Sequence, residues 1–339
     1  MKKAVVVLLL MTFGQLALCQ DVRIRIGELE FFGINGLDTG SIRASMPSIL
    51  GREVSVTEVH QVKAAIREAV IKVTGHSPTD VALVCCDARG MATIYIGLAN
   101  QLPSSAFRYK PSPSGHVRLS EQAVHLYEDW SKLSVEALQK NAAEDRSKGY
   151  ALSLYPPMRA KELALREYAL GHEGALQLVA LHSADSNQRA IAVHMLGYAR
   201  RSRTQISTLV SASRDPDEGV RNNAVRALGV LAQASAAIAK SIPANSFIDM
   251  LNSGTWTDRN KANYLLVVLS KTRDPRLLHQ LRLRAFASLT EMARWRDPKH
   301  ADDARMILGR VAELPENELV KLVAEGEVER IVSAAQHPK

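Results

Sequence analysis

The second half of the chain repeats one short pattern, Arg-x-x-Ala-x-x-x-Leu, and this repeat constrains the fold more than any other feature. The four copies are Arg189-Ala192-Leu196, Arg221-Ala224-Leu228, Arg259-Ala262-Leu266 and Arg282-Ala285-Leu289. Alanine and leucine one turn apart share a helix face, where alanine permits close approach and leucine fills the space between helices. A single helical hairpin cannot bury such a face, but a stack can. We therefore predict stacked helical hairpins over residues 158–339.

A second motif recurs in the same half of the chain, as Arg214-Asp215-Pro216, Arg273-Asp274-Pro275 and Arg296-Asp297-Pro298. Aspartate is a favoured helix N-cap, and proline fits the first turn because its missing N–H costs no hydrogen bond there. Each motif therefore predicts the start of a helix. The recurrent arginines of the longer pattern are predicted to pair with the Asp turn of an adjacent repeat. Apolar residues at helical spacing over 315–332 predict a terminal cap.

The segment SRDPDEGVRNNAVRALGVLA, at 213–232, resembles a HEAT repeat of the type also found in phycobilin lyases. The resemblance implies an α-solenoid that binds protein partners along its surface, with an enzyme of a lyase-like class as the alternative. The sequence contains no Gly-rich phosphate loop, nucleophile elbow or metal-ligand pair. Five histidines of the repeat half are scattered without ligand spacing, at His172, His182, His194, His279 and His300. The sequence favours a non-enzymatic scaffold with no catalytic, cofactor or metal site.

Residues 1–19 have the features of a secretory signal peptide. Lys2 and Lys3 precede an uncharged apolar run, and small residues before Gln20 provide a cleavage site. We therefore expect export to the periplasm or the extracellular space. A lipoprotein anchor through Cys19 is the disfavoured alternative, because Leu18 stands where a lipobox carries a small residue.

The next segment predicts a small α+β module. Apolar residues alternate along 22–31, which is typical of a half-buried strand, and the alternation changes phase at Gly27, which predicts a bulge. Ser55 and Glu58 form a capping box that opens a long helix. Two later apolar runs predict a closing hairpin.

The order of strand, short helix, long helix and hairpin, with FFGINGL after the strand and SILGREVS before the long helix, resembles the POTRA module of periplasmic transport and outer-membrane assembly proteins. The resemblance covers about residues 21–98. It implies a module that binds a partner segment at an exposed sheet edge, and a spacer domain without a ligand is the alternative. The predicted fold is therefore mainly α, an α-solenoid of HEAT-like hairpins preceded by a small α+β domain.

Residues 99–157 are predicted to join these two parts. Proline and serine mark a linker, and Ser120 is expected to cap a helix that runs to about Arg146. Glu144 and Asp145 are adjacent, so on a helix they point in different directions and do not share a site. We expect them at a solvated helix end.

Two basic clusters are candidates for binding an acidic partner: Arg200, Arg201 and Arg203, and Arg294, Arg296 and Lys299. Favourable interaction with a helix C-terminus is a sufficient structural reason for such charges. The net charge is +8, and it becomes +6 when Lys2 and Lys3 leave with the signal peptide. Export argues against nucleic acid and favours a protein partner, with peripheral envelope contact to anionic lipid or glycan as the alternative.

Cys85 and Cys86 are the cysteines that follow the predicted signal peptide, and they are adjacent. A bond between neighbours closes a strained ring. The sequence therefore favours two unpaired thiols and leaves a vicinal or an intermolecular disulfide as the alternatives.

Overall fold

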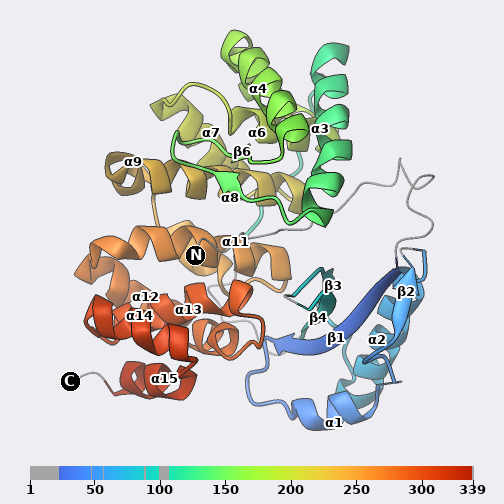
Figure 1. The fold of residues 1–339 in the computed structure, drawn as a ribbon, viewed down its shortest axis with the longest axis vertical. Helices are drawn as coiled ribbons and strands as arrows, with labels where there is room; N and C mark the ends of the chain where they lie inside the picture. Colours follow the sequence, from blue (N-terminus) through green and yellow to red (C-terminus); the bar gives the residue numbers. More distant parts are fainter. Residues whose placement is uncertain (1–22, 47, 56, 88, 99–106, 338–339) are drawn as a thin grey trace. The chain divides into compact units, whose positions relative to one another are not determined.

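The computed structural model describes residues 23–46, 48–55, 57–87, 89–98 and 107–337. The predicted signal peptide and Cys19 lie outside these residues. The fold is mainly helical with a small α/β module, as the sequence predicts (Figure 1). Two compact units divide the chain. The first contains Arg108–Phe247 and Tyr264–Lys271, and the second contains the described parts of Val7–Phe107 with Ile248–Asn263 and Thr272–Lys339.

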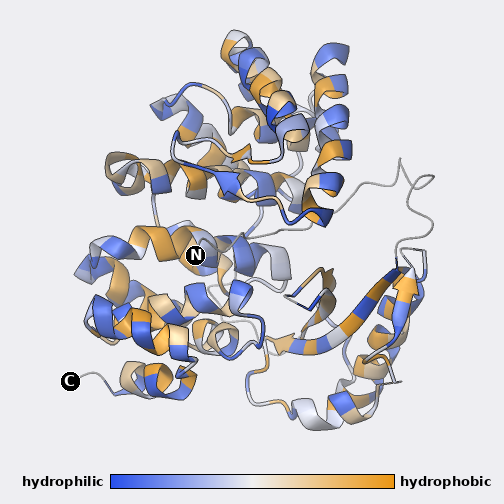
Figure 2. Ribbon diagram, in the orientation of Figure 1, coloured by the Kyte–Doolittle hydropathy of each residue, from blue (hydrophilic) through white to orange (hydrophobic). Residues whose placement is uncertain are grey.

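The module in the second unit is a four-stranded sheet with two helices. Its strands are β1 (Arg23–Phe32), β2 (Glu53–Ser55), β3 (Asp80–Val84) and β4 (Met91–Gly97), in the order β2-β1-β4-β3. β1 and β4 are parallel, and the other neighbours are antiparallel. The helices are α1 (Thr39–Ala44) and α2 (Val59–Thr74). The alternation of β1 is visible as bands of colour in Figure 2, and it places one row of apolar side chains in the module core.

Local signals in the module are confirmed in detail. The pairing of β1 with β4 shifts register between Ile26 and Glu28, so the predicted bulge lies at Gly27. A Cβ on Gly27 would lie 2.8 Å from the Cβ of Met91, which leaves no room for a larger residue. Ser55 and Glu58 form the capping box: the N–H of Ser55 donates to Glu58 at 2.8 Å, and the N–H of Glu58 donates to Ser55 Oγ at 3.3 Å.

The first unit consists of helices packed in successive pairs. They are α3 (Glu121–Gln139), α4 (Pro156–Gly171), α5 (Glu173–His182), α6 (Ser186–Leu196), α7 (Arg203–Ala212), α8 (Glu218–Ala234) and α9 (Ala236–Ser241). α5 packs on α6, and α8 packs on both α6 and α7. A short hairpin of β5 (Glu144–Asp145) and β6 (Leu152–Ser153) lies against α4.

The predicted helix from Ser120 to about Arg146 is wrong only at its C-terminal end, after Gln139. α3 is capped by Ser120 but ends at Gln139. Asn141 has a φ of 50°, a left-handed conformation that a helix cannot continue through. Glu144 and Asp145 therefore lie in the β5–β6 hairpin, and the predicted solvated helix end does not exist.

Helical pairs also make up the rest of the second unit. α10 (Asn245–Met250) and α11 (Trp256–Leu269) cross the division between the units, and η2 (Ser270–Thr272) follows. α12 (Pro275–Ala293) packs on α13 (Pro298–Val311), which also contacts α14 (Glu316–Glu325) and α15 (Val328–Gln336). The predicted terminal cap is thus two helices, separated at Gly326 with φ 73°. No helix in the described ranges has both the length and the apolarity needed to cross a membrane.

The alanine and leucine positions of the repeat form the core, as predicted. Each of the eight side chains is at most 1% exposed: Ala192, Leu196, Ala224, Leu228, Ala262, Leu266, Ala285 and Leu289. Glycine follows the leucine at Gly229 because any side chain there would overlap the ring of Tyr264. The repeat pattern therefore encodes helix-to-helix packing.

Candidate functional site

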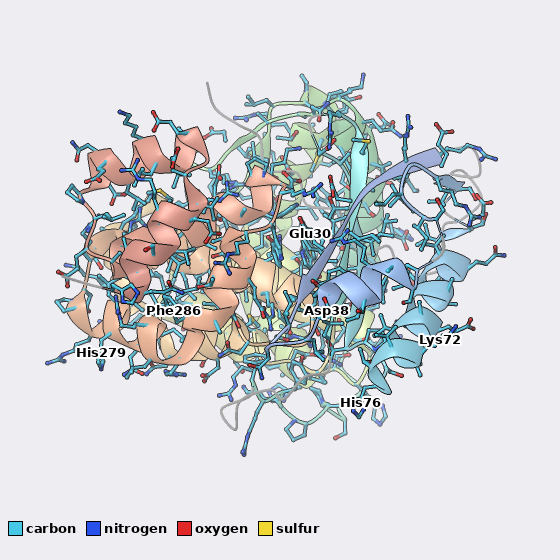
Figure 3. The ribbon with its side chains drawn as sticks, turned by 90° about the horizontal axis from the view of Figure 1, so that it is seen from below. Glu30, Asp38, Lys72, His76, His279 and Phe286 are labelled. Atoms are coloured by element: carbon cyan, nitrogen blue, oxygen red, sulfur yellow. A yellow bond between two sulfur atoms is a disulfide. The ribbon has the colours of Figure 1, made fainter. Side chains whose placement is uncertain are left out.

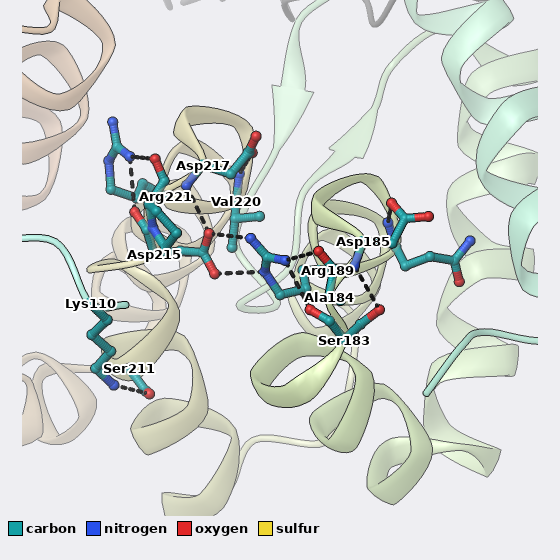
Figure 4. Close-up of polar contacts among 12 residues, drawn as sticks. Lys110, Ser183, Ala184, Asp185, Arg189, Ser211, Asp215, Asp217, Val220 and Arg221 are labelled. Carbon is teal, nitrogen blue, oxygen red and sulfur yellow. Dashed lines mark hydrogen bonds and ion pairs between the residues drawn. The ribbon is translucent and has the colours of Figure 1, made fainter. Parts of the chain in front are cut away.

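The recurrent arginines are structural, as the sequence predicts. Arg189 is 2% exposed, and its Nε and Nη2 atoms donate to the two carboxylate oxygens of Asp215 at 2.8 Å each (Figure 4). Its Nη1 atom donates to the carbonyl oxygens of Ser183 and Ala184. Arg221 bonds in the same way to the carbonyls of Asp215 and Pro216. Arg189 therefore joins the turn before its own helix to the Asp turn of the next repeat, as predicted. Arg221 instead bonds to the turn before its own helix and stacks on the ring of Tyr109. Neither buried guanidinium is available to a ligand.

One detail of the Arg-Asp-Pro motif differs from the prediction. Asp274 and Asp297 cap α12 and α13 as expected. α8, however, is capped by Asp217, whose Oδ1 accepts the N–H of Val220 at 3.0 Å. Asp215 is instead committed to the buried pair with Arg189.

In the second unit, Glu291 of α12 holds the module on the helices. It accepts the N–H groups of Gly33 and Ile34 at 2.9 and 2.8 Å, and it pairs with the buried Arg259 at 3.0 Å. Trp295, which is 1% exposed, donates from Nε1 to the carbonyl of Phe31 and packs against Tyr95. The end of β1 is therefore fixed to the repeat helices by both polar and aromatic contacts.

The predicted basic cluster of Arg294, Arg296 and Lys299 lies in this unit, and each member has a partner within the chain. Arg294 forms two bonds of 2.8 Å with Glu329. Arg296 bonds to Glu28, and its N–H donates to Glu30, which lies on β1 (Figure 3). Lys299 donates from Nζ to the carbonyl of Cys86 at 2.8 Å. These charges hold the module and the terminal cap.

Removing the charge of Arg296 should have a small effect on stability. The side chain is 72% exposed, and exposed ion pairs contribute about 0–1 kcal/mol. We expect Arg296→Ala to lower the free energy of unfolding by less than about 1 kcal/mol in urea titrations. A larger loss would mean that this pair, rather than Glu291 and Trp295, anchors the module.

The other predicted cluster, Arg200, Arg201 and Arg203, lies in the first unit at the connection between α6 and α7. All three side chains are exposed. Arg200 lies 3.8 Å from Glu173, whereas Arg201 and Arg203 have no ion-pair partner among the described residues. Arg201 packs over Gly149 of the β5–β6 hairpin, where the exposed Lys148 adds a further positive charge.

The opposite end of α6 is covered by the chain itself. Residues 107–119, part of the predicted linker, run over the connections that precede α6 and α8. Gly115 bridges to Ser183, and the N–H of Lys110 donates to the carbonyl of Arg214 at 2.7 Å. The α6–α7 edge is therefore more accessible to a partner than the side of the first unit that residues 107–119 cover.

A small pocket lies at the C-terminal end of α6, where the α6–α7 connection begins. Its lining residues come from α6, α8 and the β5–β6 hairpin: Ala151, His194, Gly197, Tyr198, Asn223, Arg226, Ala227 and Val230. Glu144 accepts hydrogen bonds from both Arg226 and Arg146. Glu144, which the sequence places at a solvated end, is thus partly buried and central to the ion pairs at this pocket.

Two buried titratable groups adjoin the pocket. Burial raises the pKa of Glu162 to about 7, although the N–H of Ser153 opposes this by donating to its carboxylate. Burial, and then the charge of Arg226, lowers the pKa of His194 to about 3. His194 is therefore a neutral imidazole at physiological pH.

Cys85 and Cys86 are joined to each other in the structure. This is the vicinal disulfide that the sequence left as an alternative to unpaired thiols. Among the described residues, no three His, Cys, Asp or Glu side chains are grouped so that they could hold a metal ion.

Comparison with known proteins identifies the repeat. Two engineered proteins with crystal structures from the Northeast Structural Genomics Consortium are similar in structure. The first shares 15% sequence identity with this chain, and the match covers 64% of this chain and 95% of that protein, with a TM-score of 0.39. The second shares 17% sequence identity, and the match covers 53% of this chain and 91% of that protein, with a TM-score of 0.35. No curated protein matches this chain. The POTRA-like interpretation of residues 21–98 is not confirmed by these comparisons. Residues 175–262 match the family of HEAT repeats, and this part of the chain is therefore a HEAT-repeat structure.

Proposed function

We propose that the chain is an exported, non-enzymatic scaffold that binds an acidic segment of a protein partner at the α6–α7 edge of its HEAT repeats. HEAT repeats suggest a protein-binding scaffold. The observation that carries the finer proposal is the accessible positive charge of Arg201 and Arg203, which lack an ion-pair partner among the described residues. Unpaired charges of one sign on an exposed edge attract a segment of the opposite sign.

The other positive groups that the sequence singles out are already engaged within the chain, and this supports the choice of the Arg200–Arg203 cluster. Arg189, Arg221 and Arg259 are buried, and each makes hydrogen bonds to neighbouring repeat residues. Arg294, Arg296 and Lys299 are engaged by Glu329, Glu28 and Cys86. The Arg200–Arg203 cluster is the predicted cluster whose charges remain accessible.

Charge reversal at this cluster should abolish binding of the protein partner. We expect affinity purification of tagged chain after mild crosslinking to recover a protein that is lost with the double variant Arg201→Glu, Arg203→Glu. Recovery should also fall steeply as salt rises, because exposed charges are screened. The readout is quantitative mass spectrometry of the captured proteins.

A matched control is the double variant Arg276→Glu, Arg330→Glu, which changes the net charge equally with two exposed residues of the second unit. This control should retain the partner. If both double variants lose it, net charge rather than the α6–α7 edge is responsible. If neither does, the partner binds elsewhere and the proposal is wrong.

Export is part of the proposal and has its own test. The features of residues 1–19 support cleavage before Gln20. Fractionation of cells that express the full chain, with sequencing of the protein's N-terminus, should find a processed form outside the cytoplasm. An unprocessed cytoplasmic protein would contradict this part alone.

A further inference from the structure

Two arginines and two carboxyl groups lie at or beside the pocket in the first unit. Arg146 and Arg226 both donate to the one carboxylate of Glu144. The neighbouring carboxyl of Glu162 is 1% exposed and accepts the N–H of Ser153, and Tyr198 donates to it at 3.4 Å. Burial favours the neutral form of such a carboxyl group. Two guanidinium groups thus lie beside one carboxylate, that of Glu144, and a second carboxyl group whose charged form is disfavoured by burial.

The pocket also contains a polar atom that lacks a hydrogen bond. His194 is 7% exposed and lines the pocket, and its Nε2 atom is buried without a partner among the described residues. A buried polar group without a partner costs about 1–3 kcal/mol. A neutral imidazole can carry its proton on Nε2 and donate it. A ligand that accepts this hydrogen bond would recover that cost.

The size of the pocket restricts the ligand. It has room for about one water-sized group, which admits an oxygen of a carboxylate and excludes a ring. The pocket and the basic cluster are close in the fold, since Arg201 packs over Gly149, two residues before the pocket-lining Ala151. A segment bound along Arg200–Arg203 therefore lies close to the residues that line the pocket.

We propose that this pocket binds one carboxylate group of the acidic segment, with Arg226 as the opposite charge and His194 Nε2 as the hydrogen-bond donor. The proposal rests on the proposed function for the source of the carboxylate. The pocket chemistry itself can be tested without the partner, because a small carboxylate alone carries the same group.

Acetate is the probe for the pocket, and acetamide is its uncharged control. We expect acetate to shift the Nε2 resonance of His194 in long-range ¹H–¹⁵N spectra of the full chain, in a saturable way and in the millimolar range. Acetamide has nearly the same shape without the charge, so it should cause little shift. His194→Leu assigns the resonance by its loss. Equal shifts with both probes, or no shift with acetate, would overturn the proposal.

Glu144→Gln provides a variant with the opposite sign of effect. The carboxylate of Glu144 pairs with Arg226 and repels a second anion, and this variant removes its charge. Acetate should therefore bind about tenfold more tightly in the same titration. An increase in affinity cannot arise from a misfolded variant. Arg226→Lys keeps the charge but loses the planar fork, and should weaken acetate binding about fivefold or more. Unchanged affinity in Glu144→Gln would also overturn the proposal.

A hexaglutamate peptide separates this inference from the proposed function. The double variant Arg201→Glu, Arg203→Glu should lose the peptide but keep acetate binding within about threefold, because the pocket residues are untouched. If acetate binds at His194 and the peptide does not bind, the proposed function fails and the pocket stands. If the peptide binds through the cluster without moving the His194 signal, the pocket proposal fails alone.

Discussion

Replacing Arg189 by alanine should lower the free energy of unfolding by about 3–5 kcal/mol. Arg189 and Asp215 are 2% and 6% exposed, and two bonds of 2.8 Å join them. Removing one partner of a buried pair leaves the other charge without compensation in a medium that solvates it poorly. The variant also leaves the carbonyls of Ser183 and Ala184 without their donor. Urea unfolding followed by far-ultraviolet circular dichroism measures the loss.

Arg118→Ala is the matched control for Arg189→Ala. Arg118 also lies close to an aspartate, at 3.8 Å from Asp185, but its side chain is 70% exposed. An exposed pair contributes at most about 1 kcal/mol. If Arg189→Ala costs no more than Arg118→Ala, the recurrent arginines are not the structural links between repeats that we describe.

The repeat half was predictable because its information is local and periodic. Alanine and leucine one turn apart identify the buried face of each helix wherever they recur, and Ala224 and Leu228 are both fully buried. The pairing of Arg189 with the turn of the next repeat follows from the same periodicity. In the module, the bulge at Gly27 and the capping box at Ser55 depend on residues within a few positions of each other.

The features that escaped prediction depend on distant contacts or on a single backbone conformation. Glu291 caps the turn at Gly33 across 258 positions, and no local pattern signals that contact. The early end of α3 depends on Asn141 in a left-handed conformation, for which asparagine is only a weak signal. Once α3 ends there, Glu144 can turn back toward Arg226.

The candidate site was therefore predicted only in part. Arg200, Arg201 and Arg203 form a visible run in the sequence, and the structure places all three on an exposed edge. The pocket beside them was not predicted, because its residues come from α6, α8 and a hairpin that was interpreted as helix. A glycine at Gly149, with φ 80°, was the available signal for a turn in that segment.

Glu162→Gln and His194→Gln should change the slope of unfolding free energy against pH in opposite directions. The pKa of Glu162 is raised from 4.5 to about 7, so in the native protein its contribution to stability is full below pH 4.5 and is lost as pH rises toward 7. The pKa of His194 is lowered from 6.5 to about 3, so its contribution is full above pH 6.5 and is lost as pH falls. Each effect amounts to about 3 kcal/mol between pH 7 and pH 4.5, at about 1.4 kcal/mol for each unit of pKa shift.

These two effects nearly cancel in the native protein, and each variant removes one of them. Relative to native protein, Glu162→Gln should gain about 3 kcal/mol as pH rises from 4.5 to 7, because its amide cannot ionise. It keeps an oxygen for Ser153 and can donate to Tyr198. His194→Gln should instead gain about 3 kcal/mol relative to native protein as pH falls over the same range. Urea titrations at several pH values measure both differences. Parallel pH profiles for the two variants would contradict the opposing pKa shifts. They would also contradict the burial of a carboxylic acid and a neutral imidazole beside one pocket, because that burial is the cause of the shifts.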